Sequence, residues 1–335
     1  MSASSAQSRS AESLSPWLRR AAWAMACASF PLIFIGGLVT TTRSGMAVPD
    51  WPSTYGYNLF LYPWQTWVFG PWKLFVEHGH RLFASMVGLL AILLVVTALR
   101  TRAPRGYVIG AIVALLLVCF QGFLGGARVL LETYGVLDGR SVAFLHGVTG
   151  PLFFAFAMVY AVAASKRGTS HWATLREEPK LRSIQSGSLL LALFAFVQLV
   201  LGACLRHVPD AAEPNYFKIV TLMHLLFAGA LLVQLLTVAG GVLSRPIARR
   251  ALGGSAALLL VLLVAQISLG VMTWVLKYNY PPSFPFAEAL ATLTIEHQSA
   301  MQITTVTAHV ANGALILALA ARLAFLTRRA AAVSS

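Results

Sequence analysis

Eight long apolar runs divide this chain, and they leave few folds open to it. Each run is long enough to cross a bilayer as a helix. With 58% hydrophobic and 11% charged residues in 335, the composition is that of a polytopic membrane protein. The sequence predicts an all-α fold with transmembrane helices at about 21–42, 78–99, 107–127, 142–164, 186–205, 219–243, 252–276 and 302–326.

The basic residues set the expected topology. The formal net charge is +14, and 17 of the 25 lysines and arginines fall on the side of the spans that carries both termini. The positive-inside rule therefore places the N- and C-termini in the cytoplasm, in a membrane of the bacterial inner (cytoplasmic) type. Topology accounts for the excess charge, so no nucleic acid is expected as a partner.

An internal repeat divides the chain in two. The word Gln-x-x-Leu-Gly begins at Gln121, Gln198 and Gln266, within three odd-numbered runs. It indicates either close helix packing with an interhelical amide hydrogen bond or a polar contact to a buried cofactor. The first and third copies lie 145 residues apart, and His80 of the second run and His224 of the sixth lie 144 residues apart. These nearly equal spacings predict two four-helix bundles in the same orientation. These bundles are expected at 17–168 and 180–327, after a polar, disordered cytoplasmic tail at 1–16.

Four histidines carry the strongest chemical signal. One lies near the start of each even-numbered run, on the outer side of the membrane: His80, His146, His224 and His309. An imidazole within a membrane span is costly unless something binds it. Four at matching depth, two in each half, predict two pairs of axial ligands for the iron of two hemes.

The segment Glu77-His78-Gly79-His80-Arg81 is the most specific motif. Glu77 shares a helical face with His80 and also lies one turn before Arg81. It either forms an ordinary ion pair with Arg81 or handles protons and developing positive charge at a bound macrocycle. The arginines at 81, 128 and 206 are candidates to pair with heme propionates, or are ordinary helix-end residues.

The remaining polar and aromatic features are less specific. The loop 43–76 is rich in Trp, Tyr and Pro and is expected to be either an interfacial belt or a lid over a site that opens outward. His207 and His297 are expected at the membrane interface, with the entrance to a site as the alternative. The cysteines are read as small buried residues of the spans: Cys27, Cys119 and Cys204.

From about residue 17 to 327 the chain resembles the heme A synthase family. The resemblance rests on Glu77-x-x-His80-Arg81, the lone histidines of the later even runs, and three further motifs: Gly36-Gly37 leading to Ser44-Gly45-Met46, Pro49-Asp50-Trp51-Pro52, and Gln121-x-x-Leu-Gly-Gly-x-Arg128. It implies two pseudo-symmetric four-helix bundles and an oxidoreductase of monooxygenase or dehydrogenase type. That enzyme would convert a ring methyl of heme O to a formyl group, giving heme A for cytochrome oxidase.

The resemblance also assigns roles. His80 and His146 would bind the substrate heme, with Arg81 and Arg128 beside them and Glu77 as the catalytic residue. A permanent heme B would be held by His224 and His309, with Arg206. Two features depart from the family pattern: the first outer loop has no cysteine pair, and no arginine follows His309. The implied partners are an unidentified membrane electron donor and the heme O synthase, with a homo-oligomer left open.

Three other functions compete with this interpretation. A bis-histidine cytochrome would transfer electrons without altering a heme, but such proteins commonly place hemes toward both faces, and Glu77 would have no task in one. A transporter could use the histidines as a proton relay. A regulatory or assembly paralogue could bind heme without turnover.

Overall fold

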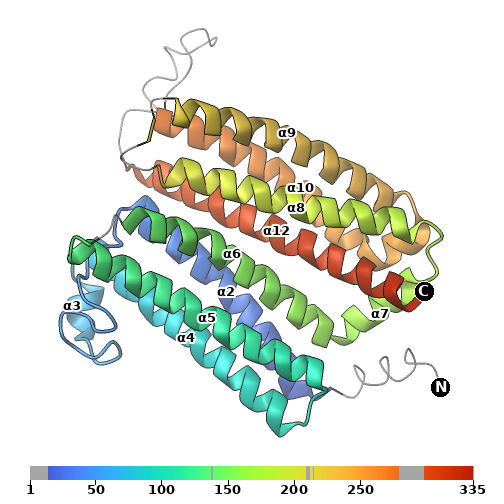
Figure 1. Cartoon of the computed structure of the whole chain (residues 1–335), viewed down its shortest axis with the longest axis horizontal. Coiled ribbons are helices and arrows are strands. Elements are labelled where there is room, and N and C mark those ends of the chain that lie inside the picture. The colour runs from blue at the N-terminus through green and yellow to red at the C-terminus, as the bar shows by residue number, and fades with distance from the viewer. Residues whose placement is uncertain (1–13, 137–138, 209–211, 214, 279–297, 335) are drawn as a thin grey trace.

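The computed structural model of the protein describes residues 14–136, 139–208, 212, 213, 215–278 and 298–334. Within these ranges the regular structure is α-helical, apart from one isolated bridge between Thr54 and Tyr57 (Figure 1). The helices are α2 (Pro16–Thr41), α3 (Trp64–Val68), α4 (Trp72–Arg100), α5 (Arg105–Thr133), α6 (Gly139–Ala164), α7 (Lys166–Leu175), α8 (Leu181–Arg206), α9 (Tyr216–Leu243), α10 (Pro246–Tyr278) and α12 (Ala300–Ser334).

Eight of these helices are long and apolar enough to cross a bilayer, which confirms the predicted polytopic all-α fold. Each of the eight begins before the apolar run that predicted it. Helix α4, for example, begins at Trp72 rather than near residue 78. Pro71 caps it, and a proline is well placed at the start of a helix because its missing N–H has no partner there in any case.

The predicted disordered tail, 1–16, lies almost wholly outside the described residues. Its last residues belong to the fold. Pro16 occupies the first turn of α2, and the Ser15 hydroxyl accepts a hydrogen bond of 3.2 Å from the Trp17 amide. Serine is a favoured residue at this position because it pairs one of the free amides of the first turn.

The long helices pack in two rings with the same order of contacts. In the first, α2 packs on α4, α4 on α5, α5 on α6, and α6 returns to α2. In the second, α8, α9, α10 and α12 repeat this sequence of neighbours. We call them the N-terminal and C-terminal bundles; they lie side by side in Figure 1. In each ring the second and fourth helices, which carry the histidines, face each other across the centre.

Helix α12 joins the two bundles. It packs on α8 and α10 within its own ring, and also on α2 and α6 of the other. It accordingly has many buried residues, whereas few residues of α9 are buried. The larger apolar core continues across this junction, since Phe154, Ala155 and Val162 of α6 belong to it.

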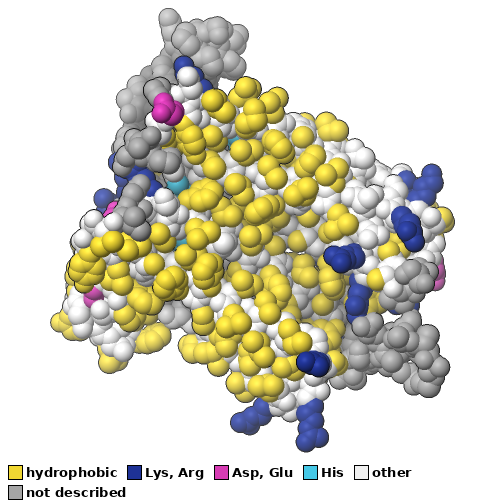
Figure 2. Space-filling view, viewed as in Figure 1, with side chains coloured by type: hydrophobic (Ala, Val, Ile, Leu, Met, Phe, Trp, Pro, Cys, Tyr) yellow, Lys and Arg dark blue, Asp and Glu magenta, His cyan; other side chains and the backbone are white. Residues whose placement is uncertain are grey.

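The surface of the helices is apolar where a bilayer would surround it. Hydrophobic side chains cover the middle of the molecule in Figure 2, and Lys and Arg gather at the end where α2 begins and α12 ends. Cys27 and Cys119 lie on this exposed surface and Cys204 is partly exposed, so the expectation that they are buried was wrong. In a membrane protein an apolar residue can face lipid as readily as the core.

Candidate functional site

All four predicted histidines pack on a glycine of the preceding long helix. An added Cβ would lie 3.1 to 3.7 Å from the imidazole Cε1, which is tighter than an ordinary contact at Gly36 and Gly270 and ordinary at Gly202 and Gly125. The pairs are His80 on Gly36, His146 on Gly125, His224 on Gly202 and His309 on Gly270. Three of these glycines are the last residue of a Gln-x-x-Leu-Gly word. Close helix packing, one of the two interpretations of the repeat, therefore explains part of it.

The structure brings the histidines together in two pairs. His80 and His146 lie close enough for a charge on one to act on the other, and the same holds for His224 and His309. Each pair spans the centre of one bundle. Among the described residues no group of three or more His, Cys, Asp or Glu side chains lies close enough to hold a metal ion. Two imidazoles do match a metal whose equatorial positions belong to a flat macrocycle.

The glutamines of the repeated word approach the histidines unequally. In the C-terminal bundle, Gln198 Nε2 lies 3.2 and 3.1 Å from Nδ1 and Nε2 of His224, and Gln266 Nε2 lies 3.5 Å from Nε2 of His309. In the N-terminal bundle, Gln121 instead donates to the Thr149 hydroxyl at 2.5 Å. The predicted interhelical amide hydrogen bond is present in all three copies.

Several buried polar atoms around these histidines have no hydrogen-bond partner. Buried polar atoms in folded proteins are nearly always paired. Their concentration at the bundle centres is therefore typical of a site that a ligand with acceptor and donor groups completes. These atoms are Nδ1 of His80, Nε of Arg128, Nη1 of Arg206 and Oε1 of Gln198. Nδ1 of His146 and Nδ1 of His309 also lack a side-chain partner, but these two histidines lie beside the backbone of Gln121 and Gln266.

Glu77 lies buried at the start of α4, and both of its carboxylate oxygens are engaged. Oε1 accepts from Nη2 of Arg81 at 2.6 Å, and Oε2 accepts from the Val48 amide at 3.0 Å. The side chains of Glu77 and Arg81 are 4% and 10% exposed. The predicted ion pair exists, but it is buried and it holds the outer loop.

Arg81 directs its guanidinium at the backbone of that loop. Nη1 donates to the carbonyls of Asp50 (2.7 Å) and Ser53 (3.0 Å), and Nη2 donates to that of Val48 (3.0 Å). These contacts and the Glu77 pair use the two terminal nitrogens. Arg81 therefore fixes the loop over the N-terminal bundle, and it does so from the first turns of the helix that carries His80.

His78 was not singled out from the sequence, yet it is buried in the same junction. Its Nδ1 lies 3.0 Å from the Thr54 hydroxyl, and its ring packs against Tyr62 and Trp67 with centroids 5.1 and 5.4 Å apart. The aromatic loop 43–76 is thus folded down on α4. The only signal in the sequence was the position of His78 beside His80.

The Asp50 carboxylate holds the turn at residues 53–56 by three hydrogen bonds. Its carboxylate accepts from the Ser53 hydroxyl (2.5 Å), the Tyr55 amide (2.7 Å) and the Gly56 amide (2.9 Å). Partial burial raises the pKa of Asp50, but these hydrogen bonds outweigh it and hold the pKa below its ordinary value of 3.8. The next residue, Trp51, lies directly over Gly126 of α5, where no side chain would fit.

Arg128 and Arg206 both approach the histidines. Arg128, on α5, is close to His146, and its guanidinium lies over Gly45 of the outer loop. Its Nε is 3.9 Å from Glu132 Oε2. Arg206, at the end of α8, crosses between the bundles, since Nη2 donates to the Gly37 carbonyl at 2.6 Å and to the Thr41 hydroxyl at 2.9 Å.

His207 caps α8 at the junction of the two bundles rather than standing apart from them. Its Nε2 would lie 3.5 Å from a Cβ on Gly147, the residue after His146. Burial lowers the pKa of His207 to about 4, and the charges of Arg206 and Arg128 act in the same direction. The imidazole is therefore neutral at physiological pH. His297 lies outside the described residues.

Residues 19–283 match the model of the cytochrome oxidase assembly protein family, COX15-CtaA. The chain belongs to this family. A heme A synthase from Bradyrhizobium sp. (strain ORS 278) is 30% identical over 157 residues, which are 45% of this chain and 42% of that protein. Heme A synthases from Shouchella clausii (27% over 176 residues, 51% and 53%) and Beijerinckia indica (27% over 208 residues, 54% and 55%) are similar as well.

The matched part of the chain spans about half the length of these curated relatives. No solved structure matches the protein. Family membership agrees with the resemblance that the sequence motifs carry, and it agrees with an integral membrane protein of eight apolar helices.

Proposed function

We propose that the protein is a heme A synthase, an oxidoreductase that converts a ring methyl of heme O to a formyl group. The observation that carries the proposal is the repeated arrangement in which each bundle holds two neighbouring imidazoles, each packed on a glycine. One bundle then serves a resident cofactor and the other a substrate of the same shape. Family membership supports this chemistry.

The N-terminal bundle is proposed as the substrate site. His80 and His146 would bind the iron of heme O from opposite faces and fix the plane of the ring. Arg128 lies near His146, and its Nε has no hydrogen-bond partner and only a long ion pair of 3.9 Å with Glu132, so this side chain is suited to a propionate. Arg81 is a positioning residue in this scheme, because its terminal nitrogens bind Glu77 and the loop.

The C-terminal bundle is proposed to hold heme B. His224 and His309 would bind its iron, and Nη1 of Arg206, which has no hydrogen-bond partner, is suited to a propionate. Bound heme B would supply one-electron transfer. The protein contributes the fixed separation of the two sites, since α12 carries His309 and packs directly on α2 and α6.

Glu77 is proposed as the catalytic residue of the substrate site. Removing electrons from the ring methyl would leave positive charge on the adjoining edge of the macrocycle. A nearby carboxylate held in one place would stabilise that charge. The Arg81 and Val48 contacts hold the Glu77 carboxylate in one orientation, one helical turn before His80. Two successive two-electron oxidations by an external oxidant would insert two oxygen atoms at the methyl carbon as a geminal diol, which would lose water to form the aldehyde; the four electrons would leave to that oxidant.

The proposed location is a membrane of the bacterial inner type with both termini in the cytoplasm. The basic end of the molecule in Figure 2 is the end where α2 begins and α12 ends, and the positive-inside rule assigns that end to the cytoplasm. The histidine pairs then lie toward the outer face. Heme O synthase is the proposed partner that supplies the substrate.

Heme analysis tests the function. The chain is expressed with a heme O synthase in a host that lacks heme A, and extracted hemes are separated by chromatography. Heme A should appear only when both proteins are present, and the purified chain should show a Soret band and the pyridine hemochrome spectrum of heme B. Heme O and heme B without heme A would contradict the enzymatic proposal and support a cytochrome that alters no heme.

The variant Glu77→Gln tests the catalytic role. The amide can still accept from the Val48 amide but no longer carries the charge that pairs with Arg81. We expect heme A formation to fall about 100-fold or more while heme O binding stays within about threefold. The resident heme in the C-terminal bundle serves as the internal control for folding. Near wild-type heme A formation would show that Glu77 only holds the loop.

A further inference from the structure

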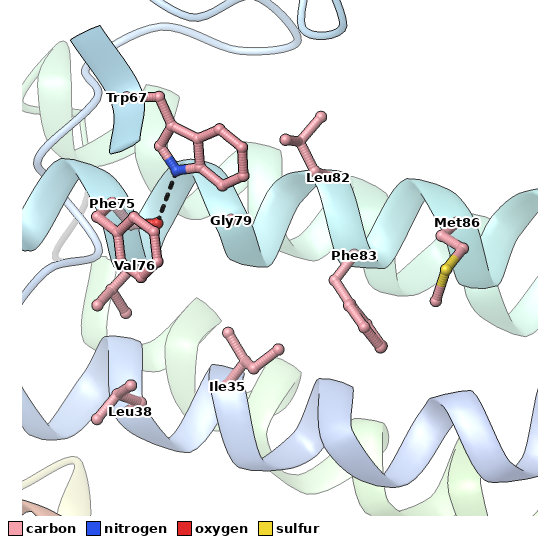
Figure 3. A pocket seen from close by; sticks show the side chains of 9 residues that line it. All are labelled: Ile35, Leu38, Trp67, Phe75, Val76, Gly79, Leu82, Phe83 and Met86. Atoms are coloured by element: carbon pink, nitrogen blue, oxygen red, sulfur yellow. Dashed lines mark hydrogen bonds between the residues drawn. The ribbon is translucent and has the colours of Figure 1, made fainter. Parts of the chain in front are cut away.

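An apolar pocket of about 390 Å³ lies between α2 and α4 in the N-terminal bundle. Figure 3 shows its two walls and the indole of Trp67, from α3, at one end. This volume is near the low end of small-molecule sites, about 300–1,000 Å³, which suits a chain rather than a flat macrocycle. Its lining includes Ile35, Leu38, Trp67, Leu82, Phe83 and Met86.

The pocket lies along the contact between α2 and α4, next to His80, the predicted iron ligand of the substrate heme. Ile35, in its α2 wall, directly precedes Gly36, on which His80 packs, and Gly79, in its α4 wall, directly precedes His80. Phe83 lies one helical turn after His80 and so borders both the pocket and the bundle centre. The pocket therefore lies along the same α2–α4 seam as the imidazole.

The lining is suited to hydrocarbon. No charged side chain takes part in it, and the one side-chain N–H, that of Trp67, is satisfied by the Phe75 carbonyl at 3.0 Å. The indole thus offers its apolar ring to the pocket. Phe75 and Met86 are 36% and 40% exposed, so the pocket opens toward the side of the bundle that lipid would cover.

We infer that this pocket binds the hydrocarbon side chain of the porphyrin substrate while His80 holds the iron. The inference rests on the proposed function and adds to it a site of selection. Heme O carries a long isoprenoid chain and heme B does not. Burying that chain removes apolar area from water only when heme O binds, so the pocket would favour the substrate over the cofactor. A chain that leaves a macrocycle at the bundle centre would pass along the α2–α4 seam, beside the His80 ring that packs on Gly36 and the Trp67 indole that packs on Gly79.

The test fills the pocket and compares two hemes. Met86→Trp narrows it from α4, and Leu38→Trp narrows it from α2. Leu93→Trp is the matched control, since it lies two turns after Met86 on the same face of α4 and is 50% exposed outside the pocket. Purified protein with its resident heme in place is titrated with heme O and, separately, with heme B, and binding is followed by Soret absorbance.

We expect both pocket variants to bind heme O at least about tenfold more weakly, with heme B binding unchanged, and the control to match wild type for both. Unchanged binding of both hemes, with loss of a co-purified phospholipid, would identify the pocket as a lipid site and overturn the inference. Equal weakening of both hemes would overturn it as well. Failure of the wild-type N-terminal bundle to bind either heme would instead overturn the proposed function, and the inference with it.

Discussion

The two bundles repeat one arrangement of helices but surround their histidine pairs differently. In the C-terminal bundle the amides of Gln198 and Gln266 reach the rings of His224 and His309. In the N-terminal bundle Leu32 stands four residues before Gly36, where the other words have glutamine, and Gln121 bonds to Thr149 instead. The imidazoles of the first pair are thus held by fewer side chains than those of the second.

The N-terminal bundle compensates with contacts at its outer end. Glu77, His78 and Arg81 bind the outer loop, and an apolar pocket opens beside His80. An amide nitrogen only donates, so each of these contacts uses a ring lone pair. When that ring nitrogen binds iron instead, the same glutamines can still orient the imidazoles, and groups that orient a ligand raise metal affinity. A site closed by a loop and open at a side pocket favours exchange. The difference matches a resident cofactor in one bundle and a substrate in the other.

Removal of one axial histidine from each bundle should have the largest effect. His309→Ala should lower the heme-to-protein ratio of the purified protein at least about tenfold, whereas His80→Ala should keep that heme but form no heme A. The pyridine hemochrome assay measures the ratio. His171→Ala, in α7, is the control and should change neither. Loss of the co-purified heme in His80→Ala alone would place the resident heme in the N-terminal bundle.

The glutamine contacts should have the next largest effect. Gln198→Leu gives α8 the residue type that α2 has at Leu32, and we expect heme to leave the C-terminal bundle about tenfold faster. Gln121→Leu should leave that rate unchanged, because Gln121 lies in the N-terminal bundle and bonds to Thr149 there. Transfer of heme to excess apomyoglobin measures the rate. Equal rates in the two variants would show that the amides do not distinguish the bundles.

The glycines under the histidines should have a smaller, graded effect. A Cβ at Gly36 would lie 3.1 Å from His80 Cε1, but one at Gly125 would lie 3.7 Å from His146 Cε1, an ordinary contact. We expect Gly36→Ala to weaken heme O binding about three- to tenfold and Gly125→Ala to leave it near wild type. Titration with heme O measures both. The reverse order would contradict the packing described for the N-terminal pair.

The smallest expected effect concerns pH. The folded-state pKa of Asp50 lies below its ordinary value of 3.8, so its carboxylate stabilises the loop above that pH and the contribution is lost as the pH falls further. Between about pH 5 and about pH 3, the melting temperature of the wild-type protein should therefore fall by about 1 °C more than that of Asp50→Asn. An identical acid dependence in the two proteins would contradict this role.

Periodic and repeated features of the sequence were the ones that could be predicted. The eight spans follow from long apolar runs, and the four histidines stand out because ionisable residues are rare in such runs. Gly36 was not identified as a partner of His80, because its helix lacks the glutamine that marks the other three glycines.

Two kinds of feature could not be predicted. The contacts of Glu77, His78 and Arg81 with residues 48–54 join segments of irregular backbone, whose conformation leaves no periodic signal. The exposure of Cys27 and Cys119 was missed because lipid-facing and core positions are equally apolar. Helix α4 began earlier than its apolar run, since helix ends are set by caps such as Pro71 as well as by hydropathy.

The arginine that ends α8 has a consequence for the stability of a separated half. Arg206 belongs to the fifth span, but its hydrogen bonds reach the Gly37 carbonyl and the Thr41 hydroxyl of the first. If the polypeptide were split between α6 and α8, this guanidinium would meet hydrocarbon in place of those oxygens, which is costly. The two halves therefore supply polar partners to one another, so a separated C-terminal bundle should be less stable in the bilayer than the same bundle in the whole chain.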